Sequence, residues 1–139
     1  ADPLKSACWL ETVRAGHPVA IDGDLDTLMA GLACGEVSAL AWTILEHAAD
    51  AVIGLSDEAA VDGMRLLAEG RHGDAPLVAG ESAVAGLMAL IQASGEPDAR
   101  ARLGLDNQSR ILVFGTEGAT DPLVYRQYVG REPESIETG

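Results

Sequence analysis

Apolar residues recur at helical spacing in several stretches of the chain. Between residues 37 and 49 the apolar positions share one helical face: Leu40, Ala41, Ile44, Leu45 and Ala48. Similar patterns, bounded by capping residues and glycines, predict further helices over residues 2–15, 56–69, 82–93 and 122–129. Short polar turns separate most of these stretches, so we expect the helices to be connected by loops at the surface.

Three short apolar runs between the helices predict strands. Residues 51–55 are partly β-branched, as in a buried strand, and residues 77–79 and 110–114 are similar. Strands that alternate with helices predict an α/β fold with a small, mainly parallel sheet flanked by helices. Such a unit normally begins with a strand, whereas Asp2 and Pro3 resemble the cap and first turn of a helix. We therefore expect the first strand to be missing and the chain to be a fragment of a larger polypeptide.

Composition narrows the range of partners. A chain of 139 residues suits one compact domain, and its net charge of -13 argues against nucleic-acid or membrane-surface binding, which needs clustered Lys and Arg. No apolar run approaches the roughly 20 residues of a membrane span, and no signal peptide opens the sequence. Cys8 and Cys34 lack metal or redox spacing and are expected to be buried thiols in a reducing cytosol. A cytoplasmic protein is expected.

An acidic loop and three histidines are the candidate metal ligands in the sequence. Asp22, Asp24 and Asp26 are spaced like the start of a calcium loop, but Thr27 stands where that loop needs glycine and Ala33 where it needs glutamate. We expect a solvated turn that caps a helix. The histidines have no ligand spacing, so no metal site is expected: His17, His47 and His72.

Small residues gather in three segments, residues 28–36, 80–86 and 115–121, each with a hydroxyl or carboxylate group. Backbone can approach a flat ligand closely where glycine leaves no Cβ, and a nearby helix N-terminus offers free N–H groups. Taken singly, each segment also suits an ordinary helix start or strand-to-turn transition. Their occurrence together favours a ligand site at the carboxyl ends of the strands.

In this order, the three segments resemble the C-terminal part of the fold-type-II pyridoxal-phosphate lyases, the tryptophan-synthase-β-like enzymes, and within them the diaminopropionate ammonia-lyases. The resemblance covers roughly residues 2–130. It implies that residues 1–130 are the C-terminal portion of the catalytic domain that binds pyridoxal phosphate, followed by an acidic flexible tail at 131–139. The implied reaction is elimination from 2,3-diaminopropionate to pyruvate and ammonia.

The resemblance also implies roles for particular residues. Thr116 matches the hydroxyl that contacts the cofactor's ring nitrogen, and Gly118 belongs to the same turn. Gly31 matches a glycine whose backbone lies beside the lysine-linked cofactor, and Glu81 a carboxylate near the ring, although Glu81 could equally cap a helix. A neutral hydroxyl does not hold the ring nitrogen protonated, which suits eliminations at Cβ. Gly115 stands where close relatives are expected to have serine, so no second hydroxyl can replace Thr116.

Two parts of such a site are not found in the sequence. This chemistry needs a lysine for the Schiff base and a glycine-rich loop for the phosphate, but the single lysine, Lys5, lies outside any fitting motif. We therefore expect no catalytic residue in this chain, weak cofactor binding and inactivity without the remainder of the polypeptide. Exposed apolar surface should favour self-association, and the full-length enzyme is expected to be a homo-oligomer acting on a small amino acid. The alternatives are a threonine or serine dehydratase segment and a non-catalytic acidic α/β module that binds a ligand or partner.

Overall fold

The computed structural model describes residues 1–136, in which helices flank a parallel sheet of two short strands. Strand β1 (Asp2–Pro3) pairs with β2 (Gly54–Leu55), and the Asp2 N–H donates to the Ile53 carbonyl at 2.9 Å. The expected fold class, a small parallel sheet with flanking helices, is confirmed. The expectation that Asp2 and Pro3 begin a helix is wrong, because these residues form a strand.

Asp2 nevertheless caps the first helix from a distance. Its buried carboxylate accepts the Leu10 N–H at 3.0 Å, in the first turn of α1 (Cys8–Ala15). Burial raises the pKa of Asp2, and the backbone hydrogen bonds from Leu10 and Trp9 oppose that rise. Asp2 therefore caps a helix, as expected, but that helix begins at Cys8 and not at Pro3.

Most helices lie where the hydrophobic pattern places them. They are α1, α2 (Ala39–Ala48), α3 (Asp57–Glu69), α4 (Ala85–Gly95), α5 (Pro97–Arg102) and α6 (Pro122–Val129). Single 3-10 turns occur at Leu4–Ser6, Ala30–Leu32, Arg71–Gly73 and Pro133–Ser135. Helix α5 was not predicted, although Pro97 at its first position and Asp98 in its first turn are ordinary start signals. Within residues 1–136 no helix has both the length and the apolar character needed to cross a membrane.

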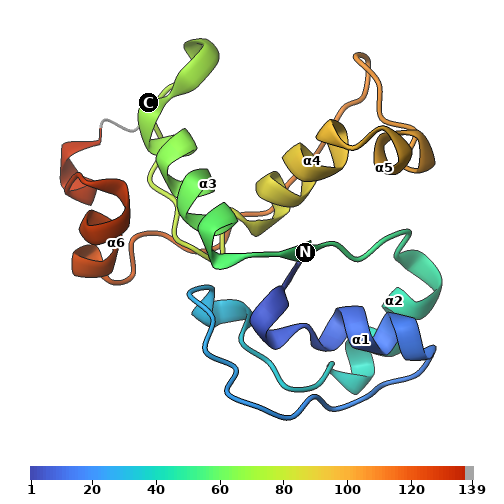
Figure 1. Ribbon diagram of the computed structural model, residues 1–139. Helices are drawn as coiled ribbons and strands as arrows, with labels where there is room; N and C mark the ends of the chain where they lie inside the picture. Colours follow the sequence, from blue (N-terminus) through green and yellow to red (C-terminus); the bar gives the residue numbers. More distant parts are fainter. Residues whose placement is uncertain (137–139) are drawn as a thin grey trace.

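The core forms where α3 packs against α4 and α6 (Figure 1). Its largest fully buried apolar side chains are Tyr125, Met29, Leu55, Met64 and Val84. Gly63 allows the close approach of α3 to α4, since a Cβ there would lie 2.7 Å from Met88 Cγ. The core therefore joins the loop before residue 30, strand β2 and three helices.

Two of the expected strands are not formed. Residues 77–79 and 110–114 are not in β-structure, and the latter run along the surface with Leu112 76% and Phe114 79% exposed. A strand needs a hydrogen-bonded neighbour as well as apolar side chains, and within the described residues β1 and β2 pair only with each other. The apolar residues at 77–79 and 110–114 suit a strand, but their pattern does not specify a neighbouring strand to pair with.

The segment after residue 130, for which we expect an acidic flexible tail, contacts the rest of the chain at two residues. Arg131 Nη1 donates to the Ala68 carbonyl at 3.1 Å, and Ile136 is buried in the core. The buried side chain of Ile136 and the hydrogen bond from Arg131 to helix α3 hold this segment against the core. Residues 137–139 of the expected tail lie outside the described residues, and the division of the chain at residue 130 stays a prediction.

Candidate functional site

Backbone and side-chain hydrogen bonds join the three glycine-rich segments. The Gly31 N–H donates to Ser82 Oγ at 3.0 Å, and the Ser82 N–H donates to Glu117 Oε2 at 2.7 Å. The Gly80 N–H donates to the Glu117 carbonyl at 3.0 Å. Segments that are far apart in sequence are therefore held side by side at one place on the molecule.

The first of these segments is anchored by Asp57, the first residue of α3. Asp57 Oδ1 accepts the Thr27 hydroxyl at 2.6 Å and the Leu28 N–H at 3.0 Å. Asp57 Oδ2 pairs with Lys5 Nζ at 2.8 Å. Burial opposes ionisation of Asp57, but the hydrogen bonds from Lys5, Thr27 and Leu28 outweigh it and lower its pKa. The loop that leads to Gly31 is thus tied to the start of a core helix.

Glycine is required for steric reasons at Gly80, and at Gly31 it avoids a tight contact. A Cβ on Gly80 would lie 2.4 Å from the Gly118 carbonyl oxygen and 2.7 Å from Glu117 Cγ. A Cβ on Gly31 would lie 3.0 Å from Ser82 Oγ, so the space in front of Gly31 is filled by the serine that accepts its N–H. Gly118 differs, because nothing lies within 4 Å of the position a Cβ would take.

The remaining candidates lie beside this junction. Thr116 is exposed, and Glu81 is half-buried. Burial raises the pKa of Glu81, its own backbone N–H opposes that rise, and the nearby carboxylates of Glu117 and Asp121 add to it. A carboxyl group in this position is more easily protonated than one in water.

The structure thus brings together the segments that carry Gly31, Glu81, Thr116 and Gly118, and it adds two residues to which sequence reasoning gave no role of their own in the site. Ser82 and Glu117 make the hydrogen bonds that join the segments. A carboxylate between Thr116 and Gly118 was the available signal, but the sequence did not show which N–H group it would accept. The roles assigned to the four candidates stay predictions.

The residues present suit one side of a pyridoxal-phosphate site. The Thr116 hydroxyl can hydrogen-bond a ring nitrogen, and Gly31 and Gly118 leave backbone exposed, whereas Gly80 is buried. The three segments contain no Lys or Arg to neutralise a phosphate. The hydrogen bond and charge of Asp57 raise the pKa of Lys5, which keeps the amine protonated and a poor nucleophile.

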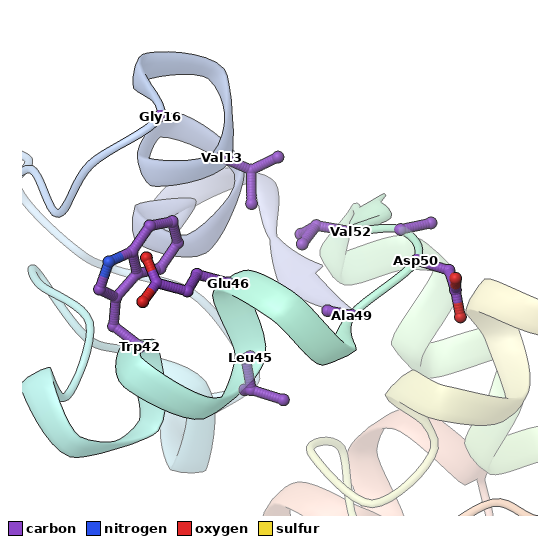
Figure 2. A pocket seen from close by; sticks show the side chains of 9 residues that line it. Val13, Gly16, Trp42, Leu45, Glu46, Ala49, Asp50 and Val52 are labelled. Carbon is purple, nitrogen blue, oxygen red and sulfur yellow. The ribbon is translucent and has the colours of Figure 1, made fainter.

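A separate hollow of about 270 Å³ lies between α1 and α2 and is lined by Val13, Trp42, Leu45 and Val52 among others (Figure 2). Trp42 also packs against Trp9, with ring centroids 6.3 Å apart. The charged groups in its wall are the acids Glu46 and Asp50, which would repel an anionic cofactor. The hollow contains none of the candidate residues, so we assign the site to the three-segment junction. Among the side chains that the structure describes, no three of His, Cys, Asp or Glu gather as a metal ion would require.

Comparison with known proteins identifies the class. Residues 1–116 match the model of the pyridoxal-phosphate dependent enzymes, and the chain belongs to this family. The family resemblance deduced from the three segments is therefore confirmed.

The chain is similar to particular members of the family. It is 37% identical over 131 residues to diaminopropionate ammonia-lyase of Escherichia coli (strain K12), a match that covers 92% of this chain and 33% of that enzyme. The enzyme of the same name from Salmonella typhimurium is 37% identical over 134 residues, with the same coverage. The crystal structure of the Escherichia coli enzyme in complex with an aminoacrylate-PLP azomethine reaction intermediate superposes with a TM-score of 0.80 at 36% identity, covering 92% of this chain and 33% of that chain. The chain spans about a third of the length of these relatives.

Proposed function

We propose that this chain forms one wall of the cofactor site in a pyridoxal-phosphate-dependent ammonia-lyase that converts 2,3-diaminopropionate to pyruvate and ammonia. The observation that carries the proposal is the hydrogen-bonded junction of Gly31, Ser82 and Glu117, which brings together the three segments that resemble the family's site. The similarity to two diaminopropionate ammonia-lyases supports the choice of substrate.

Each candidate residue has a defined part in this proposal. When bound, pyridoxal phosphate would supply a sink for the electron pair that the α-proton leaves behind, and expulsion of the β-amine consumes that pair. Thr116 holds the ring nitrogen through a neutral hydroxyl, Gly31 and Gly118 provide backbone close to the cofactor, and Glu81 places a carboxyl group near the ring. These residues bind and orient, and none of them takes part in proton transfer at the substrate.

The chain by itself is proposed to be inactive. The phosphate-binding loop and the cofactor-linking lysine would come from the rest of the polypeptide, because Lys5 is bound to Asp57 at 2.8 Å. We also propose that the full-length enzyme acts in amino-acid catabolism in the cytoplasm as a homodimer. The unpaired thiols of Cys8 and Cys34 support a reducing compartment, and the exposed Leu40 and Ile44 on α2 support further apolar contacts.

The test uses the full-length protein that contains this chain. Purified with pyridoxal phosphate, it should absorb visible light at the wavelength of the lysine-linked cofactor, and borohydride should fix the cofactor to a lysine outside residues 1–136. It should release ammonia and pyruvate from 2,3-diaminopropionate. A protein that instead works faster on threonine or serine would be a dehydratase, and one that binds no cofactor would refute the proposal.

A further inference from the structure

The side chain of Glu117 is the contact point between two of the three segments and lies close to the third. Its Oε2 accepts the Ser82 N–H at 2.7 Å, and Oε1 lies 4.0 Å from the position a Cβ on Gly31 would take. Its main-chain carbonyl accepts the Gly80 N–H at 3.0 Å. Glu117 is half-buried, so water competes only partly for these contacts.

We propose that Glu117 is a positioning residue for the cofactor wall: its carboxylate holds Ser82, and Ser82 Oγ in turn holds the Gly31 backbone. The inference rests on the proposed function, since it concerns the same wall. These two hydrogen bonds fix the position of the turn that carries Thr116 relative to the segments at residues 28–36 and 80–86. Glu117 itself need not touch the cofactor.

A carboxylate suits this position for a physical reason. Ser82 lies in the turn just before α4, where backbone N–H groups lack partners within the helix. A charged acceptor makes a stronger hydrogen bond to such a group than a neutral one and is favoured by the helix dipole. The Ser82 hydroxyl then remains oriented as an acceptor for Gly31, and a Cβ on Gly31 would make a tight contact with Ser82 Oγ at 3.0 Å.

The experiment measures pyridoxal-phosphate affinity of the full-length protein by absorbance titration, well below its melting temperature. Glu117→Ala removes the acceptor and should weaken binding by about 10-fold or more. Glu117→Gln keeps a neutral acceptor and should recover most of that loss. Ser82→Ala removes only the bond to Gly31 and should weaken binding by about 2- to 10-fold. Glu134→Ala, which removes an exposed carboxylate outside the three segments, is the control and should not change the affinity.

A second readout separates positioning from a purely structural role. If Glu117 positions the cofactor, Glu117→Gln and Ser82→Ala should lower kcat for the amino acid more than they change KM. Variants that melt at lower temperature but bind the cofactor and turn over like the unchanged protein would overturn the inference. If Glu117→Ala does not fold, Ser82→Ala decides the question alone. Failure of the unchanged protein to bind pyridoxal phosphate would refute the proposed function instead.

Discussion

Gly80→Ala is the substitution whose cost the structure defines most closely. The new Cβ would lie 2.4 Å from the Gly118 carbonyl oxygen, whereas ordinary contacts of a Cβ begin at 3.4 Å. The obstacle is backbone, so the turn at residues 117–118 must move by about 1 Å rather than rotate a side chain aside. That movement would also stretch the bond from the Gly80 N–H to the Glu117 carbonyl.

The two effects set the expected magnitude. Overpacking of this kind costs about 1–3 kcal/mol, and loss of a neutral hydrogen bond adds about 0.5–1.5 kcal/mol. We therefore expect Gly80→Ala to lower the free energy of unfolding by about 1.5–4.5 kcal/mol. It should also weaken cofactor binding in the full-length protein, because the Thr116 turn is displaced.

Urea unfolding followed by far-UV circular dichroism gives the free energy, with Gly95→Ala as the matched control. Nothing lies within 4 Å of a Cβ on Gly95, the last residue of α4, so alanine there should leave the stability unchanged or raise it by up to about 1 kcal/mol. If Gly80→Ala were as stable as Gly95→Ala and bound cofactor normally, the close approach of the two segments would be refuted.

Three further substitutions test separate contacts. Asp57→Asn should destabilise the protein at neutral pH, because the folded-state pKa of Asp57 is lowered. The difference in the free energy of unfolding between the variant and the unchanged protein should vanish as pH falls from about 4 through that pKa. A difference in urea unfolding that does not depend on pH would contradict this. Tyr125→Phe removes a buried hydroxyl that has no hydrogen-bond partner among residues 1–136, so stability should stay the same or rise by about 1 kcal/mol, and a clear loss would show a missed partner. Thr116→Ala should weaken pyridoxal-phosphate binding by about 2- to 10-fold without lowering the melting temperature, since Thr116 is exposed; unchanged affinity would remove Thr116 from the site.

Local signals predicted the helices well because caps and periodicity act within a few residues. Ser56 caps α3 by accepting the Ala59 N–H at 3.3 Å, and Gly16 ends α1 with a left-handed φ of 75°. Strands could not be predicted in this way, since their stability depends on a neighbour elsewhere in the chain. Asp2 pairs with Gly54, a partner that no local pattern could reveal, while the more β-like residues 110–114 have no strand partner within the described chain.

The candidate site was predicted as three segments but not as a set of contacts. Glycine content marks where backbone can approach backbone, which is why Gly31 and Gly80 were found at the junction. The bond from Gly31 to Ser82 spans 51 residues and that from Ser82 to Glu117 spans 35, and pairing over such separations is set by the fold. Glu117 could therefore be recognised only as a polar residue in a turn.

A crystal structure of the full-length protein with pyridoxal phosphate would show directly whether this chain forms the cofactor wall. We expect the cofactor ring to lie against Gly31, Glu81 and Gly118, with Thr116 Oγ1 within about 3.2 Å of the ring nitrogen. The phosphate and the linking lysine should lie on the part of the polypeptide outside this chain. A cofactor bound away from the three-segment junction, with Thr116 facing solvent, would refute the proposed wall.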